Sequence, residues 1–465
     1  MKLPFAPLIA YPAAHAAALP PARALALDAL GRTLAGADIQ AALDGVLGRS
    51  PQPIRFAPAD AALAAALAYG VLRLRLRLTW LLGQLISGRK KSPLPGGLHL
   101  VLLLAAYELT MLDRVPAYAT VHWAVEAVKR AYGASFAGLA NAVLRRLADL
   151  GQDARNPEWY AARLSGTPFL AVFHSLPEWI VDLWVADYGE EAARTHLAAH
   201  SATLSTPPGT ACRLNTARPG WTDLRESLMA ENQGDPVGAS GLFFRSADGA
   251  AKLRDLAAGL RLLAAEGALS FQSAGAQDIL ERLDPENWPG LIWDACAGRG
   301  GKTFALIERG LPVRLASDPS ARRLAGLQAE ARRLNLAPPP LVRARAEQPP
   351  FAFGREGAVF NTILVDAPCS GLGTLARRPD ILLRRSVADI AALAALQTDI
   401  LAACLAQLRP GGRLAYITCT MSRRENEGQV ETLAAGGCAA LEFAASTPAG
   451  VDPGERFFCA LLRRR

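Results

Sequence analysis

Histidine is scarce in this 465-residue chain, and none of the six histidines lies beyond residue 200. A Ser-His-Asp triad, a Cys-His pair or a metal site with histidine ligands is therefore excluded from the C-terminal part of the chain. The seven cysteines are also widely spaced, since no two of them lie closer than 15 residues. Without a Cys-x-x-Cys pair there is no zinc knuckle, and we expect no metal.

The sequence also lacks the marks of secretion and of membrane insertion. Its N-terminal stretch is broken by proline and shows no apolar segment followed by a cleavage site. The longest apolar run, LHLVLLLAAY, is too short to span a bilayer and runs into Glu108. An odd number of cysteines without a signal peptide is typical of the reducing cytoplasm. We therefore expect a cytoplasmic protein with no membrane partner, acting as a monomer.

Positive charge is concentrated at one end. The net charge is +8, and residues 1–150 carry 16 Lys and Arg against 8 Asp and Glu, whereas the rest of the chain is balanced. Such an excess indicates either a polyanionic partner or a solubilising surface. The basic residues that we expect to form a rim on this part are Arg73, Arg75, Arg77, the GRKK of 88–91, and Arg145 with Arg146.

The sequence pattern predicts three domains. Residues 20–150 read as about six helices in an all-α bundle, with prolines between them. Residues 151–260 mix helices with short strands, which indicates a small α/β connecting domain. From 261 to 465, apolar strands alternate with helices, as in a doubly wound, mostly parallel sheet of the Rossmann-like kind. The five predicted strands are LIWDAC, VRLASD, LVRAR, NTILVDAPC and RLAYITC.

In such a sheet, ligands bind at the carboxyl ends of the strands. Those ends carry Asp294–Lys302, Asp318, Asp366–Gly371 and Thr418-Cys419. The first stretch, DACAGRGGKT, is not a phosphate loop of an NTPase, because Cys296 stands where that loop requires glycine. A glycine-rich turn without that motif suits a nucleoside cofactor. Asp318 then either accepts hydrogen bonds from ribose hydroxyls or merely caps the following helix.

Two cysteines stand out because each follows a predicted strand in polar, turn-forming sequence. Cys369 lies in DAPCSG and Cys419 lies in TCT. If their strands are neighbours, the two thiols converge over one pocket, next to the carboxylate of Asp366. A thiolate beside a carboxylate is an arrangement for covalent catalysis.

The C-terminal part resembles the Fmu/Sun (NOL1/NOP2/sun) family of RNA cytosine-C5 methyltransferases. The resemblance rests on DACAGRGGKT, ILVDAPCSGLGTLARRPD, LRPGGRLAYITCTMSRREN and RFFCALLRR. Residues 106–146, from AYELTMLDRVPAYATVHWAVEAVKRAYG to GLANAVLRR, resemble the NusB-type RNA-binding domain. With LPEWIVDLWVADYGEEAAR between these parts, nearly the whole chain resembles the RsmB-type 16S rRNA methyltransferases.

The resemblance implies a reaction and a role for each site residue. Cys419 is expected to attack C6 of the cytosine, Cys369 to help to release the product, and Asp366 to contact the base. The implied cofactor is S-adenosylmethionine, and the implied partner is RNA, above all 16S rRNA. The expected cofactor contacts are Cys296, Ala297, Gly298, Arg299, Gly300, Gly301, Lys302, Asp318 and Asp366.

The sequence departs from the family pattern at three places. Gly298-Arg299 replace Ala-Pro in the first loop, and Gln272-Ser273 replace Gln-Asp before the domain. Arg345 stands near the position of the usual adenine-contacting Asp, for which Glu347 is a candidate substitute. Two alternatives therefore stay open beside rRNA methylation. One is a tRNA cytosine-C5 methyltransferase, and the other is a non-catalytic RNA-binding assembly factor with a decayed cofactor site.

Overall fold

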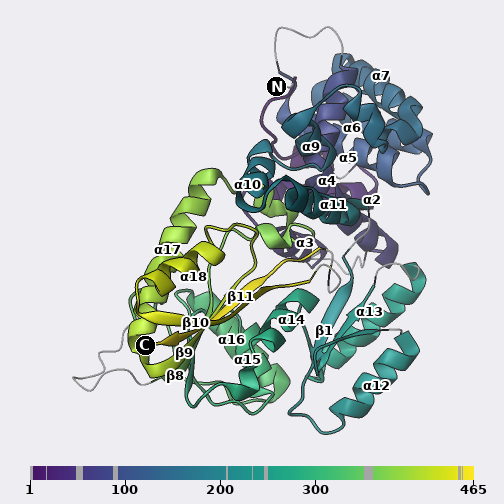
Figure 1. Cartoon of the computed structure of the whole chain (residues 1–465). Helices are drawn as coiled ribbons and strands as arrows, with labels where there is room; N and C mark the ends of the chain where they lie inside the picture. Colours follow the sequence, from purple (N-terminus) through teal and green to yellow (C-terminus); the bar gives the residue numbers. More distant parts are fainter. Residues whose placement is uncertain are drawn as a thin grey trace. The chain divides into compact units, whose positions relative to one another are not determined.

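The computed structural model describes residues 4–16, 18–48, 56–86, 93–205, 208–232, 234–245, 250–349, 360–448, 452 and 454–465. The chain divides into two compact units (Figure 1). The helical unit comprises Met1–Pro207 together with Leu375–Arg384, and the sheet unit comprises Pro208–Thr374 and Arg385–Arg465. The chain therefore leaves the sheet unit after Thr374, contributes ten residues to the helical unit, and returns.

The helical unit confirms the predicted all-α bundle. Its core is built on α5, whose apolar residues point in every direction and are almost all buried, with α2, α4, α6 and α7 packed around it. The described helices of this region are α1 (Ala13–Ala16), α2 (Pro21–Leu34), α3 (Ile39–Leu47), α4 (Pro58–Leu85), α5 (Gly96–Met111), α6 (Ala117–Tyr132) and α7 (Ala134–Leu150).

The unit continues with a second helical layer. The stretch that begins at Pro177 forms two helices, because Gly189 adopts a left-handed backbone with φ +85°. The elements here are η1 (Gly151–Ala154), α8 (Pro157–Ala161), α9 (Gly166–Phe173), α10 (Glu178–Tyr188), α11 (Glu190–Ser205) and, from the returning segment, η4 (Pro379–Leu383).

The predicted basic rim on α4 is wrong for Arg73 and Arg77, while Arg75 is half-buried. Arg73 and Arg77 are each only 7% exposed. Arg73 Nε donates to the carbonyl of Ala376 at 2.8 Å, and Arg77 donates to the carbonyl of Phe173 and lies over its ring. Because α4 is packed on several sides, Arg73 and Arg77 turn inward, and burial lowers the pKa of both guanidinium groups. The GRKK of 88–91 lies outside the described residues.

The sheet unit begins with a small antiparallel sheet of order β2-β3-β1-β4. The short strands predicted within residues 151–260 correspond to its β1 and β3, and β4 lies beyond that range. Its strands and helices are β1 (Thr210–Leu214), α12 (Trp221–Asn232), β2 (Asp235–Val237), β3 (Gly241–Phe244), α13 (Ala250–Ala265) and β4 (Leu269–Phe271).

The larger sheet has seven strands in the order β10-β11-β9-β8-β5-β6-β7. The five predicted strands are β5–β9 and run parallel, whereas β11 pairs antiparallel with both β9 and β10. From β5 the chain builds outward through β6 and β7, and then resumes on the other side with β8. The strands are β5 (Ile292–Asp294), β6 (Val313–Ser317), β7 (Leu341–Val342), β8 (Phe360–Asp366), β9 (Leu408–Thr418), β10 (Ala439–Ser446) and β11 (Phe458–Arg464).

Helices cover both faces of this sheet (Figure 1). Alternate residues of β8 and β9 face two separate cores, one shared with α17 and α18 and the other with α14 and α15. The elements are α14 (Ala274–Arg282), η2 (Pro285–Asn287), α15 (Gly301–Ile307), α16 (Ala321–Leu334), η3 (Leu372–Thr374), α17 (Val387–Gln407) and α18 (Glu427–Ala435).

Among the described residues, α17 is the one single helix long and apolar enough to cross a membrane. Its buried side chains include Ile400, Leu401 and Leu405, which pack in the core beside β8 and β9. Since 33% of its apolar window is buried, contact with the sheet accounts for part of the apolar composition of α17.

Candidate active site

The two cysteines singled out in the sequence lie together. Asp366 ends β8 and is paired with Ile417 of the neighbouring strand β9, so the loops that follow both strands start side by side. Cys369 Sγ lies 3.3 Å from Cys419 Sγ and 3.4 Å from the backbone nitrogen of Cys419. The contact with Cys419 and then burial raise the pKa of the Cys369 thiol well above its ordinary value. Cys369 is therefore the thiol that keeps its proton and can donate it toward Cys419.

An ion pair joins the first loop to the end of β8. Lys302 Nζ lies 2.6 Å from Asp366 Oδ2, and the side chains are 10% and 36% exposed. Burial by itself lowers the pKa of Lys302, but the attraction of Asp366 outweighs burial and the pKa is raised. The lysine thus keeps its charge, and it holds one carboxylate oxygen of Asp366 in a fixed place.

The loop from Cys296 to Lys302 connects β5 to α15 and depends on its glycines. Gly298 and Gly300 have φ of +57° and +89°, which a residue with a side chain rarely adopts. A Cβ at Gly300 would also lie 2.8 Å from Leu327. The Arg299 side chain lies over α16, where a Cβ at Gly326 would be 3.3 Å from its Cγ. The loop therefore presents backbone rather than side chains.

Asp318 stands at the end of β6 and is 2% exposed. One of its oxygens accepts from Gly298 N at 3.2 Å, and the other accepts from Ser320 N at 2.8 Å. Ser320, not Asp318, caps α16, because its side chain accepts from Arg323 N. Asp318 thus ties the first loop to the second strand end, and the cap alternative is wrong for this residue.

The sequence pattern marks Asp294 only as the start of the first loop. In the structure its side chain faces the candidate active site. It is 1% exposed, and its Oδ2 accepts from Thr303 Oγ1 at 2.6 Å. Burial raises its pKa to about 7, with the Thr303 hydrogen bond acting in the opposite direction. A run of small residues after an apolar strand was the signal that could have identified it.

The structure shows the contacts made by the residues that depart from the family pattern. Arg345 is 70% exposed and lies 3.6 Å from Glu347, whose side chain is 16% exposed. Ser273 caps α14 by accepting from Ala276 N, and Gln272 hydrogen-bonds to the carbonyl of Gly301 at 3.4 Å. The Gln272-Ser273 pair therefore still starts the helix and touches the first loop.

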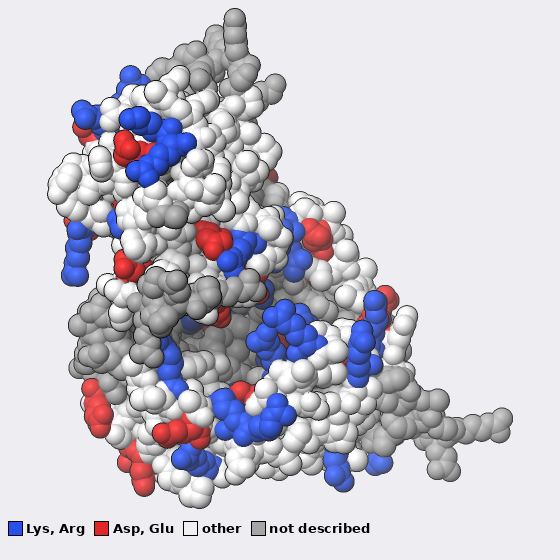
Figure 2. Space-filling model, turned by 180° about the vertical axis from the view of Figure 1, so that it is seen from behind, with Lys and Arg blue, Asp and Glu red and all other residues white. Residues whose placement is uncertain are grey.

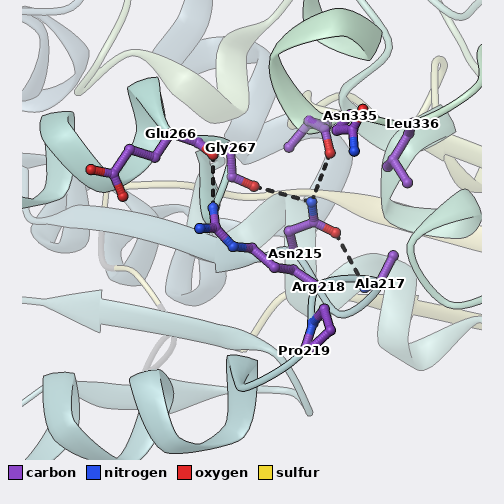
Figure 3. Close-up of a pocket in the computed structure, with 9 residues that line it drawn as sticks. Asn215, Ala217, Arg218, Pro219, Glu266, Gly267, Asn335 and Leu336 are labelled. Carbon is purple, nitrogen blue, oxygen red and sulfur yellow. Dashed lines mark hydrogen bonds between the residues drawn. The ribbon is translucent and has the colours of Figure 1, made fainter.

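Within the described ranges, no group of three or more His, Cys, Asp or Glu side chains could hold a metal ion. A cavity of about 300 Å³ lies elsewhere in the sheet unit, and none of its lining residues belongs to the loops above (Figure 3). There Asn215 Nδ2 donates to the carbonyls of Gly267 and Leu334, and Arg218 donates to the carbonyl of Glu266. These hydrogen bonds satisfy backbone carbonyls at the C-terminal ends of α13 and α16. They indicate that the residues around this cavity have a structural role.

Comparison with known proteins agrees with this geometry. Residues 280–458 match the family model described as 16S rRNA methyltransferase RsmB/F, and residues 20–149 match that of the NusB family. The ribosomal RNA small subunit methyltransferase B of Xanthomonas campestris is 32% identical over 86% of this chain and 83% of its own length. The protein of the same name from Vibrio cholerae is 32% identical over 88% of both chains.

Two solved structures share the fold. A protein solved under the name PH0851 aligns with 96% of this chain and 99% of its own, at 17% identity and a TM-score of 0.71. A methyltransferase homologue from Pyrococcus horikoshii covers 65% of this chain and 100% of its own, at 22% identity and a TM-score of 0.50. Since the Xanthomonas relative exceeds 30% identity over most of both lengths, the chain belongs to the RsmB/F family of 16S rRNA methyltransferases, with a NusB-family domain in its helical unit.

Proposed function

We propose that this protein methylates C5 of a cytosine in 16S rRNA, with S-adenosylmethionine as methyl donor and Cys419 as covalent nucleophile. The observation that carries the proposal is the pair of thiols 3.3 Å apart at the ends of adjacent parallel strands, beside the Lys302–Asp366 ion pair. The proposed RNA substrate follows from the names of the relatives, since those from Xanthomonas and Vibrio are called small subunit ribosomal RNA methyltransferases.

The residues present fit the proposed cofactor. The left-handed glycines Gly298 and Gly300 expose the loop backbone, and Asp318 lies under that loop. A carboxylate has about four lone-pair sites, so Asp318 can accept from ribose hydroxyls in addition to its bonds within the chain. The loop Cys296–Lys302 would hold the rest of the cofactor, which when bound supplies an electrophilic methyl group. Cys296 has a pKa raised well above its ordinary value by burial, and it acts there as a neutral side chain.

The chain's own residues account for the remaining chemistry. The Cys419 thiolate would add to C6 of the cytosine, forming an S–C6 bond and making C5 nucleophilic. After methylation at C5, a base removes the C5 proton, the S–C6 bond breaks and the thiolate is regenerated. Cys369, which holds its proton beside Cys419, is placed to assist this release. Lys302 holds one carboxylate oxygen of Asp366, and the other oxygen would contact the cytosine.

The helical unit offers a surface for RNA, although not the one predicted on α4. Its exposed Lys and Arg on α6 and α7 are Lys129, Arg130, Arg145 and Arg146, and basic side chains gather on the part of the unit that carries these helices (Figure 2). A groove of about 490 Å³ runs between α6 and α7, with the 79%-exposed Tyr118 among its lining residues. Cations for phosphates and an exposed ring for an unpaired base are the features of a single-strand RNA site.

The test of the proposed function is incorporation of labelled methyl groups. Purified protein is incubated with 16S rRNA, 23S rRNA or bulk tRNA and methyl-labelled S-adenosylmethionine, and the RNA is digested to nucleosides. We expect labelled 5-methylcytidine from 16S rRNA alone. Label in tRNA alone would mean that the substrate is tRNA and not rRNA. If no RNA is labelled but the protein still binds RNA, the non-catalytic assembly factor would be favoured.

A further inference from the structure

A buried acid outside the expected site joins the two cysteine loops. Glu425 precedes α18, and its side chain is fully buried at 0% exposure. Its carboxylate accepts four hydrogen bonds. Three come from the loops of the two cysteines: Ser370 N at 2.8 Å, Ser370 Oγ at 2.6 Å and Thr420 Oγ1 at 3.3 Å. The fourth comes from Gln397 Nε2 on α17 at 3.2 Å.

These bonds fall on the residues that follow each cysteine in the chain. Ser370 is the next residue after Cys369, and Thr420 is the next residue after Cys419, so one carboxylate holds both loops. The two hydroxyls also contact each other at 2.5 Å. Gln397 extends the clamp, because its Nε2 also donates to the carbonyl of Pro368 at 2.9 Å.

Burial raises the pKa of Glu425 itself, whereas its hydrogen bonds from Ser370, Gln397 and Thr420 favour the ionised form. When it is ionised, the Glu425 carboxylate opposes negative charge at Cys369 and is one cause of the raised pKa of that thiol. The other groups that act on the pair come from several elements. Cys419 follows β9, Tyr416 lies within it, and Arg385 donates to the carbonyl of Cys369 at 3.4 Å. On the first loop, Lys302 is attracted by Cys419 and paired with Asp366. Lys302 therefore acts on the Cys419 side, and the buried Glu425 carboxylate acts on the Cys369 side, where Arg385 contacts the backbone carbonyl.

We propose that Glu425 is a positioning residue that fixes the division of labour between the thiols: its carboxylate clamps the Cys369 loop against the end of β9 and opposes a second negative charge at Cys369, so that the thiolate forms on Cys419. The inference rests on the proposed function, because it assigns roles within the same covalent reaction. Glu425 itself acts through the two loops and contacts no reacting atom.

Two variants separate the charge from the clamp. Glu425→Gln keeps the geometry, since its Oε1 can still accept from Ser370 N and Gln397 while its amide donates to the two hydroxyls. It removes only the charge. Ser370→Ala keeps the charge and removes one hydroxyl of the clamp. Glu431→Gln is the matched control, because Glu431 is an exposed residue of α18 that pairs with Arg423 on the surface.

The first measurement is alkylation of each cysteine by iodoacetamide as a function of pH, resolved by peptide mass spectrometry on the full chain. We expect the midpoint for Cys369 to fall by about one pH unit in Glu425→Gln and to stay unchanged in Ser370→Ala and Glu431→Gln. The second measurement is steady-state methylation. We expect kcat to fall about tenfold or more in Glu425→Gln and in Ser370→Ala, with KM for RNA and for cofactor within about twofold.

A wild-type Cys369 profile and a wild-type kcat in Glu425→Gln would overturn the proposal. So would a uniform shift of every cysteine, because that would report loosened structure. If Glu425→Gln does not fold, Ser370→Ala tests the clamp. A wild-type kcat in Ser370→Ala would then overturn the proposal. The alkylation profile needs no RNA, so a shifted Cys369 midpoint in a protein that methylates nothing would support the assignment of charge and overturn the proposed function separately.

Discussion

Cys369 Sγ and Cys419 Sγ lie 3.3 Å apart, although 50 residues separate them in the chain. This contact makes the two thiols distinguishable by substitution. Cys419→Ala should abolish turnover and form no adduct, because no sulfur remains to attack C6. Cys369→Ala should still attack and methylate, and then stall as a protein–RNA adduct. The measurement is a denaturing gel of each variant with substrate RNA and labelled cofactor.

The reverse pattern, with an adduct from Cys419→Ala and none from Cys369→Ala, would exchange the two roles. Cys404→Ala serves as the control, since Cys404 is a fully buried core residue of α17 outside the site loops. It should behave as the wild type in the adduct assay.

The Lys302–Asp366 ion pair predicts a second outcome. Lys302→Met keeps the length of the side chain and removes the charged hydrogen bond to Asp366. A charged hydrogen bond contributes roughly 1.5–3 kcal/mol, so kcat/KM should fall about 10- to 100-fold. Steady-state kinetics measure this loss. Activity equal to that of the wild type would show that Asp366 needs no partner.

Asp318 predicts a loss of cofactor affinity. Asp318→Ala removes the acceptor for Gly298 N and the proposed acceptor for ribose, so the affinity for S-adenosylhomocysteine should fall about tenfold or more. Isothermal titration calorimetry gives the constant directly. Arg323→Ala, which removes only the 60%-exposed partner of Asp318, is the control and should bind within about twofold of the wild type. Equal affinities in both variants would rule out the ribose role.

The exposed cations of α6 and α7 predict a change in salt dependence. The triple variant Lys129→Gln, Arg130→Gln, Arg145→Gln should bind RNA more weakly, and the slope of log affinity against log salt should flatten by about 0.7 per lost phosphate contact with single-stranded RNA. Fluorescence anisotropy at several salt concentrations measures both. Arg194→Gln, an exposed arginine of α11, is the control. An unchanged slope in the triple variant would move the RNA site away from these helices.

Asp294 predicts a pH dependence of stability. Its pKa is raised from 3.8 to about 7 by burial, so the stability associated with its protonated form is present at acidic pH and is lost as the pH rises through about 7. Asp294→Asn removes this dependence. We therefore expect the wild type to lose stability relative to Asp294→Asn between pH 5 and pH 8. Urea unfolding of both proteins at the two pH values tests this, with the exposed Asp223→Asn as control. An equal difference at both pH values would contradict the shift.

The strand ends could be predicted from the sequence, because buried parallel strands give apolar runs and the polar residues after them must meet at one edge. Cys369, Cys419, Asp366 and Asp318 were found in this way. The role of Glu425 could not be predicted, since a glutamate in MSRREN resembles an exposed surface residue. Only in the folded loops is its carboxylate surrounded by hydrogen-bond donors. Arg73 was misjudged for the opposite reason: a charged residue on a helix looks exposed until the packing of the helix is known.

The antiparallel pair β10 and β11 was also beyond the sequence argument. RFFCALLRR has the composition of a buried strand, but alternation cannot tell which neighbour it pairs with or in which direction. The destination of Leu375–Arg384 is hidden for a similar reason. Its leucines indicate burial, yet nothing local says that the partners lie more than 200 residues earlier in the chain.

The segment Leu375–Arg384 restricts how the two units of this protein can be separated by recombination in evolution. Leu375, Ile381 and Leu382 are buried within the helical unit, and Arg73 binds the carbonyl of Ala376. Recombination that carried off residues 208–465 alone would also carry off this stretch and leave its apolar side chains without cover. A lineage that lost the helical unit would therefore first have to change the segment just beyond Cys369.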